Sequence, residues 1–236
     1  VLSVGAIADL PSGFQGSADV LTFSNVGPTD DRRIKPNLVA NGEAVQSASH
    51  TGNAAYASLY GTSMAAPGIT GAVGLLGELH PRFKSRSLWA SSSKALLIHT
   101  ADDLLTPGPD IYSGWGVANV ERAATVLHSN HLGTAHAYLK EIILNNGDYV
   151  EFPVVATTNT LKVTICWTDP EGTPVAPQLD PDDRMLVNDL DLRLIASDGI
   201  TNRVWMLNPD DVTAAALVGD NIRDNVEQVC ITNTIP

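Results

Sequence analysis

The pattern of apolar and polar positions changes once along the chain, near residue 130. Before that point, short apolar runs alternate with helical stretches, which is typical of an α/β domain with a parallel sheet. The apolar runs that predict strands are residues 1–8 and a broken region at 37–40 and 44–47. The expected helices are residues 63–79, 85–101 and 120–128. The first of these carries no charge before Glu78, so we expect it to be buried on all sides.

Beyond residue 130, apolar residues alternate with polar ones, as at residues 149–154 and 161–167. Turn residues punctuate these runs, and the proline-rich acidic stretch 169–183 is expected to be a long loop. This pattern predicts an antiparallel β-sandwich or jelly roll. We therefore predict two domains, an α/β part at residues 1–130 and an acidic β-sandwich at residues 131–236.

The net charge of -12 is concentrated in the second part. Residues 1–130 hold 10 acidic and 8 basic side chains, a net of -2, whereas residues 131–236 hold 16 and 6, a net of -10. An acidic surface repels phosphate backbones and attracts hard cations, so nucleic acid is not expected as a partner. No apolar run approaches the length of about 18 residues that a membrane helix needs, so no membrane partner is expected either.

The two cysteines, Cys166 and Cys230, are too few for a disulfide scaffold or for a zinc site with paired spacing. Both occupy runs that predict strands. They form a disulfide if those strands are neighbours, and buried free thiols are the equal alternative.

Residues 61–67, Gly-Thr-Ser-Met-Ala-Ala-Pro, stand directly ahead of the first expected helix. A serine there has its hydroxyl at a helix N-terminus, where unpaired backbone N–H groups and the helix dipole favour a developing negative charge. Ser63 is therefore a candidate nucleophile for acyl transfer, and Thr62 beside it is a candidate assistant. On these grounds alone, a capping role for Thr62 or Ser63 is the alternative.

Residues 61–67 also resemble the nucleophile signature of the subtilisin-like serine proteases, the subtilases. Other segments resemble the family's motifs in the family's order: a central strand at 1–6, a Phe-Ser-x-x-Gly-Pro turn at 23–28, a Lys-Pro segment at 34–42 and a Gly-x-Gly-x-x-Asn segment at 114–119. The resemblance covers about residues 1–128. Within it, Asn37 and Asn41 replace the usual Asp and Pro, and Gly68 replaces a frequent His.

The resemblance implies a secreted serine endopeptidase that acts on protein or peptide substrates, with Ser63 as the nucleophile and its own N–H as an oxyanion donor. A serine nucleophile needs a general base and an orienting carboxylate. The family's Asp-Ser/Thr-Gly and His-Gly-Thr motifs, and its oxyanion Asn, are not found in this sequence. We therefore expect an upstream half of the catalytic domain to carry them, and the 236-residue chain alone to be inactive.

Residues 185–192 alternate carboxylates with aliphatic side chains, which places Asp189 and Asp191 on one face of a predicted strand. Neighbouring carboxylates repel unless a cation lies between them, and Asn188 offers a further oxygen. From spacing alone, a solvated strand face is an equal alternative.

Residues 185–192 and 219–227 also resemble the β-barrel domain of calcium-binding alkaline subtilases. This resemblance implies a structural calcium ion in this domain, and Asp189, Asp191 and Asn188, singled out by their spacing, are its candidate ligands. A second class of function stays open with it, a non-catalytic calcium-binding interaction module on a protease-like scaffold.

Overall fold

The computed structural model describes residues 1–84, 86–133, 139–156 and 158–232. Over these residues the chain forms three α-helices and ten short strands, which pair into five two-stranded sheets. No helix in this described part is both long enough and apolar enough to cross a membrane.

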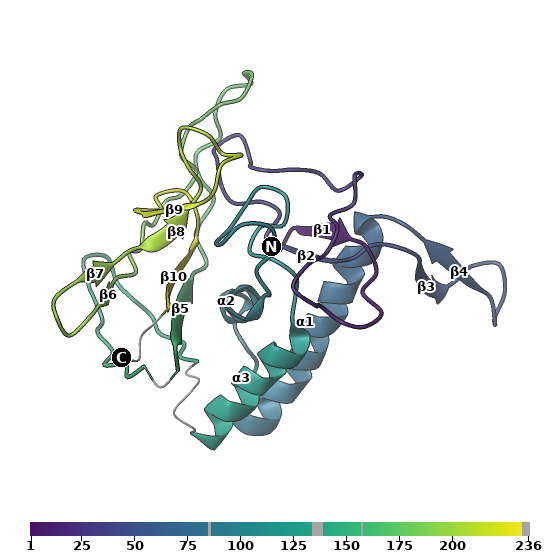
Figure 1. Ribbon diagram of the computed structural model, residues 1–236, viewed down its shortest axis with the longest axis horizontal. Helices are drawn as coiled ribbons and strands as arrows, with labels where there is room; N and C mark the ends of the chain where they lie inside the picture. Colours follow the sequence, from purple (N-terminus) through teal and green to yellow (C-terminus); the bar gives the residue numbers. More distant parts are fainter. Residues whose placement is uncertain (85, 134–138, 157, 233–236) are drawn as a thin grey trace.

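The first part of the chain combines helices with one parallel strand pair. Strand β1 (Val4–Ile7) pairs with β2 (Leu38–Asn41), with Val4 opposite Leu38. Helix α1 (Thr62–Lys84) packs against both strands, and α2 (Ala90–Thr100) and α3 (Val120–Leu132) follow it (Figure 1). The predicted parallel pairing and the three predicted helices are thus present, with shifted ends.

Side-chain caps explain two of these helix ends. The side chain of Asn119 accepts the N–H of Arg122 at 2.8 Å at the start of α3, and Gly133 closes the helix with a left-handed φ of 67°. Helix α2 begins five residues later than predicted, at Ala90. There the distant Glu141 carboxylate accepts the N–H of Trp89 at 2.9 Å, which satisfies one of the first unpaired donors.

Helix α1 is not buried on all sides, so that prediction is wrong. Its inner face, with Ala65, Ile69, Ala72 and Leu76, is buried against the strands and α3. Its outer face carries Ser63, mostly small residues and Leu75, which is 67% exposed. Among the described residues nothing covers this outer face, whose glycine, serine and threonine residues leave the helix backbone close to the surface.

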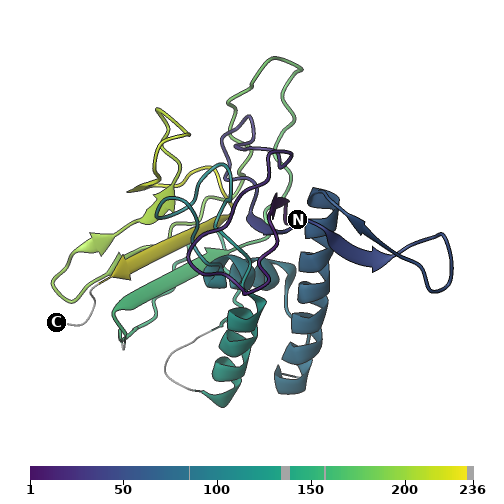
Figure 2. The same cartoon turned by 45° about the vertical axis from the view of Figure 1, so that its right-hand side comes forward.

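A hairpin leaves the body of the molecule just before α1. Strands β3 (Val45–Ala48) and β4 (Tyr56–Leu59) pair antiparallel, and Figures 1 and 2 both show the hairpin extending away from the helices. Tyr56 is 68% exposed and Tyr60 is 62% exposed. The hairpin therefore contributes little to the core.

The second part contains three antiparallel strand pairs. Strand β5 (Thr160–Cys166) pairs with β10 (Val226–Thr232) across its whole length, and two shorter pairs flank it. These are β6 (Leu194–Ile195) with β7 (Thr201–Asn202), and β8 (Val204–Met206) with β9 (Leu217–Gly219). The described residues form no closed barrel, and the predicted β-sandwich is not confirmed.

Two stretches depart from the predicted strand pattern. Residues 149–154 and 185–192 have no regular secondary structure, whereas the loop predicted at 169–183 is irregular as expected. Residues 149–154 are exposed rather than packed, as the 82% exposure of Tyr149 shows. Alternating side chains form a strand only where a neighbouring strand accepts their backbone hydrogen bonds, and no such strand lies beside residues 149–154 in the described part of the chain.

One hydrophobic core joins the two parts. Ile34, Leu38 and Leu97 from the first part belong to the same buried cluster as Leu207 and Val226 from the second. Helix α2 supplies the link because it packs against β5 as well as against α3. The two predicted domains therefore bury apolar surface against each other.

The two cysteines are on paired strands but are not neighbours. Cys166 lies opposite Val226, and Cys230 lies opposite Lys162, four positions further along the ladder. Four residues of strand span about 13 Å, far beyond the roughly 7 Å that a disulfide allows between Cα atoms. Both cysteines are accordingly free thiols.

Candidate active site

Ser63 lies in the first turn of α1, where the sequence places it. The helix begins at Thr62, and the carbonyl of Gly61 accepts the N–H groups of Met64 at 3.0 Å and Ala65 at 3.3 Å. Ser63 is exposed, whereas Thr62 is half-buried. The N–H groups of Thr62 and Ser63 precede the first N–H that the carbonyl of Gly61 accepts, so these two remain available to an anionic group beside Ser63.

The turn ahead of Ser63 is fixed to the central strands. The N–H of Gly61 donates to the carbonyl of Gly42 at 2.9 Å, and the N–H of Gly42 donates to the carbonyl of Ile7 at 3.0 Å. Gly61 has a φ of 150°, which a side chain rarely permits. A Cβ on Gly42 would lie 2.9 Å from the carbonyl oxygen of Gly61. The two glycines therefore allow the chain to pass from β2 to Ser63 at close range.

In the described part of the chain, no histidine hydrogen-bonds to Ser63. His80 lies 17 residues further along α1, about 26 Å away at the rise of an α-helix. His99 lies on α2, and its Nδ1 atom is 3.0 Å from the hydroxyl of Thr164 on β5. The remaining described histidines are at the hairpin tip and in the last turns of α3: His50, His128 and His131. A general base for Ser63 is therefore not in place among these residues.

An exposed serine in a glycine-fixed turn at a helix N-terminus is an arrangement suited to acyl transfer. Residues 1–116 match the model of the subtilase family. This subtilase segment is just under half of the chain, and it contains Thr62, Ser63 and the strands that hold their turn. It ends shortly before α3, so the second part of the chain lies outside the match.

Known relatives carry protease names. The chain is 27% identical over 206 residues to "Serine protease/ABC transporter B family protein tagA" of Dictyostelium discoideum, which covers 74% of this chain but only 11% of that protein. Among solved structures, the patellamide maturation protease PatA is 29% identical, with 55% of this chain and 43% of that chain covered and a TM-score of 0.43. The Clostridium perfringens CspB protease is 29% identical, with 54% and 27% covered and a TM-score of 0.46.

The second predicted site lies outside the subtilase segment, and its acidic residues are paired with arginines. Asp189 forms an ion pair with Arg184 at 3.2 Å, and Asp191 forms one with Arg193 at 2.8 Å. Arg193 also reaches Asp220, at 3.0 Å. Burial raises the pKa of Asp189, and the neighbouring charges of Asp191 and Asp220 raise it further, against the effect of Arg184. Asp189 and Asp191 are thus close enough to repel.

Asn188 points to a different partner. Its side-chain amide and its backbone N–H both donate to Asp169 Oδ1, at 2.8 and 2.9 Å. The structure therefore brings Asp189 and Asp191 into one neighbourhood but engages Asn188 elsewhere. In the described ranges, no group of three or more His, Cys, Asp or Glu side chains is arranged to hold a metal ion.

Glu227, which the sequence pattern did not predict as a site residue, is a fully buried acid on β10, close to Leu192. Its side chain is fully buried, Oε2 accepts the N–H of Leu192 at 2.6 Å, and Oε1 has no hydrogen-bond partner among the described residues. Burial raises the pKa of Glu227 to about 8, and the charges of Asp191 and Asp189 add to this effect. The sequence gives no signal for it, because both faces of β10 are buried at this point.

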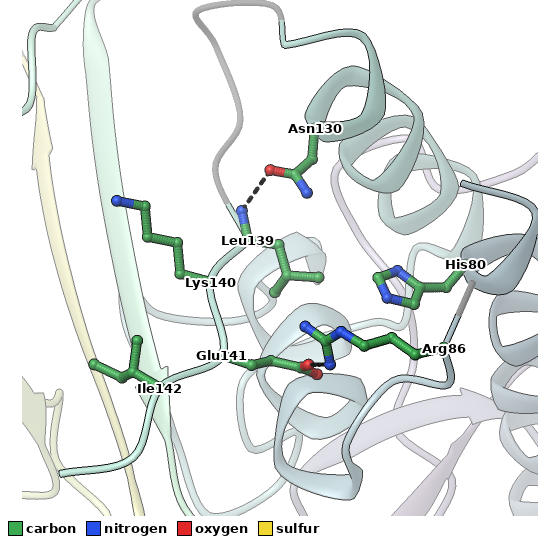
Figure 3. A pocket seen from close by; sticks show the side chains of 7 residues that line it. All are labelled: His80, Arg86, Asn130, Leu139, Lys140, Glu141 and Ile142. Carbon is green, nitrogen blue, oxygen red and sulfur yellow. Dashed lines mark hydrogen bonds and ion pairs between the residues drawn. The ribbon is translucent and has the colours of Figure 1, made fainter. Parts of the chain in front are cut away.

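A cavity of about 240 Å³ lies at the opposite end of α1 from Ser63. Figure 3 shows residues 139–142 along one side of it: Leu139 donates its N–H to Asn130, and Glu141 pairs with Arg86. Glu141 also accepts the Ser92 hydroxyl at 2.5 Å. These contacts join residues 139–141 to α3 and to the start of α2, and they engage three of the polar side chains that line the cavity, those of Arg86, Asn130 and Glu141.

Proposed function

We propose that this chain forms the nucleophile-bearing part of a subtilisin-like serine endopeptidase. The observation that carries the proposal is the position of Ser63, exposed in the first turn of α1 inside the segment that matches the subtilase model. The name of the Dictyostelium relative, a serine protease, supports the same reaction.

In the proposed mechanism, Ser63 Oγ attacks the carbonyl carbon of a peptide bond. The unpaired N–H groups of the first helical turn, that of Ser63 among them, then stabilise the negative charge on the carbonyl oxygen. Thr62 supports the geometry of this turn. The proton of the hydroxyl passes to a histidine oriented by a carboxylate, both of which another part of the protein or another chain supplies.

The surfaces around Ser63 support such a complement. The outer face of α1 carries small residues and the exposed Leu75, and the neighbouring hairpin exposes Tyr56 and Tyr60. Exposed large apolar side chains that lie together favour a contact with another segment. We propose that the segment bearing the base and the carboxylate covers it, and that without this segment the chain has no peptidase activity.

The test joins this chain to a segment that carries the Asp-Ser/Thr-Gly and His-Gly-Thr motifs and treats the product with a fluorophosphonate probe. We expect mass spectrometry to find the probe on Ser63, and peptidase activity to disappear in Ser63→Ala. Thr62→Ser is the matched control and should retain labelling. Labelling of another residue with Ser63 unmodified would refute the assignment.

A second proposal concerns calcium. The mutual repulsion of Asp189 and Asp191 favours a hard cation, which would have to displace Arg184 and Arg193 from the two carboxylates. Asn188 takes part only if it leaves Asp169. A cation that binds only the folded state stabilises it by about 2.7 kcal/mol at a hundred times its dissociation constant.

Thermal melts in calcium, magnesium and EDTA test this proposal. We expect calcium to raise the melting temperature of the parent chain, magnesium to do less, and Asp191→Asn to lose the effect. Asp211→Asn, an exposed acid in another loop, is the control and should respond as the parent does. An equal response in parent and Asp191→Asn would show that the arginine pairs suffice.

A further inference from the structure

Residues 31–34 of the first part form hydrogen bonds and an ion pair with residues of the second. The N–H of Ile34 donates to Asp224 Oδ1 at 3.0 Å, although 190 positions separate the two residues. Ile34 is fully buried and Asp224 is only 5% exposed, so water does not compete for this bond. A buried carboxylate that accepts a backbone N–H is a strong and directional contact.

The turn that presents Asp224 is itself rigid. Asn221 donates its side-chain amide to Asp224 Oδ2 at 3.1 Å and accepts the N–H of Asp224 at 3.1 Å. It also accepts the N–H of Arg223 at 3.1 Å. Residues 221–225, named here the clamp turn, therefore hold their shape through side-chain contacts within the turn.

Arg223 attaches the clamp turn to the residues just before Ile34. Its Nη1 donates to the carbonyl of Asp31 at 3.2 Å and to the carbonyl of Asp182 at 2.8 Å. Asp182 pairs in turn with Arg32 at 3.2 Å. These contacts bring two loops of the second part onto the same short segment of the first.

The clamp turn also hydrogen-bonds to α2. Lys94 is only 8% exposed, and its Nζ donates to Asn225 Oδ1 at 2.8 Å. Asn225 donates its own amide to the carbonyl of Trp167 at the end of β5, at 2.7 Å. The turn thus makes polar contacts to residues 31–34, to α2 and to its own sheet.

The held segment leads directly to Ser63. After Ile34, the side chain of Asn37 accepts the N–H of Ser3 at 3.0 Å, and β2 begins at Leu38. Strand β2 ends one residue before Gly42, whose carbonyl accepts the N–H of Gly61. A displacement of residues 31–37 would therefore be transmitted to the turn that presents Ser63.

We propose that the clamp turn, through Asp224 and Arg223, holds residues 31–37 in place and thereby positions the Gly61–Ser63 turn. The second part of the chain is then a positioning device for the first rather than an appended module. This inference concerns the backbone and holds whether or not Ser63 is a nucleophile.

Hydrogen exchange of the whole 236-residue chain, followed by mass spectrometry, tests the proposal. Replacing Asp224 with Ala should speed exchange in residues 33–42 by about tenfold and in residues 60–66 by about threefold. Peptides from residues 201–219 should change by less than about twofold. Asp211→Ala is the matched control, because Asp211 accepts the N–H of Thr213 at 2.9 Å but only within its own loop.

Unchanged exchange at residues 33–42 in Asp224→Ala would overturn the proposal, and so would an equal acceleration at residues 201–219. If Asp224→Ala does not fold, the proposal is tested by measuring exchange of the same peptides in Arg223→Gln. This variant keeps Asp224 and removes the contacts to Asp31 and Asp182. We expect about threefold faster exchange at residues 31–42 in that variant. No change there would equally contradict the clamp.

Discussion

At the residue scale, Gly61 and Gly71 differ in whether their backbone and surroundings can accept a side chain. Gly61 has a φ of 150°, a backbone conformation that alanine adopts only with strain. Gly71 lies on the exposed face of α1 with nothing within 4 Å of a built Cβ. The first position requires glycine, and the second does not.

We therefore expect opposite effects on the free energy of unfolding. Gly61→Ala should lower it by about 1–3 kcal/mol, whereas Gly71→Ala should raise it by about 0.5–1 kcal/mol because alanine favours a helix interior. Urea denaturation of the two variants and the parent measures both changes. A stabilising Gly61→Ala would show that the turn ahead of Ser63 is not strained by a side chain.

The position of Ser63 was also the part of the site that the sequence predicted best. A glycine before a serine, followed by small residues and an apolar run, determines a turn and a helix start by local rules. Glu227 could not be found in this way, because its burial depends on which elements cover β10. The arginine partners of Asp189 and Asp191 likewise depend on how an irregular loop folds, and alternation suggested a strand there.

At the scale of elements, the contact between α2 and β5 contains a partly buried histidine. His99 Nδ1 lies 3.0 Å from the Thr164 hydroxyl, and Gln228 donates to the same hydroxyl at 3.1 Å. Burial lowers the pKa of His99 to about 4, and the positive charges of Lys162 and Arg122 lower it further. The folded protein therefore keeps this side chain neutral where the unfolded chain, near 6.5, begins to bind a proton.

This difference predicts a loss of stability in acid. Between about pH 6.5 and 4 the unfolded state binds the extra proton, so the free energy of unfolding should fall as pH falls, by at most about 1.4 kcal/mol per pH unit. His99→Gln should remove this component, which urea denaturation at several pH values measures. His50→Gln, at an exposed position in the β3–β4 hairpin, should keep the parent profile. Parallel profiles for the parent and His99→Gln would contradict the prediction.

The helices and strands show which structural features the local sequence pattern can predict and which it cannot. Helices α2 and α3 were predicted because apolar spacing specifies a helix from within. Helix α1 was predicted correctly as a helix but wrongly as fully buried, since burial depends on what packs against it. Residues 149–154 have the alternation of a strand but no partner strand among the described residues, so the same pattern gives an irregular, exposed segment.

At the scale of the whole molecule, the shared core makes the two parts interdependent. Leu207 and Val226 of the second part are buried in the cluster that contains Ile34 and Leu97 of the first. A chain cut at residue 132 would expose that apolar surface and leave the N–H of Ile34 without its acceptor.

We therefore expect the 236-residue chain to unfold in a single calorimetric transition, with equal calorimetric and van 't Hoff enthalpies. A chain of residues 1–132 should show no cooperative transition and should bind the dye ANS. Two separate transitions in the whole chain, or a cooperative one in residues 1–132, would instead support two independent domains.

The spacing of Cys166 and Cys230 on their paired strands has a further consequence, for the chemistry of the surroundings in which the chain folds. Because the two thiols are held four positions apart, neither oxidation nor reduction can close or open a cross-link between them without breaking the β5–β10 ladder. The native fold thus requires both thiols to be reduced. Oxidation of the unfolded chain to a Cys166–Cys230 disulfide would exclude this strand register, so the refolding yield should be highest in reducing glutathione buffers and should fall in oxidising ones.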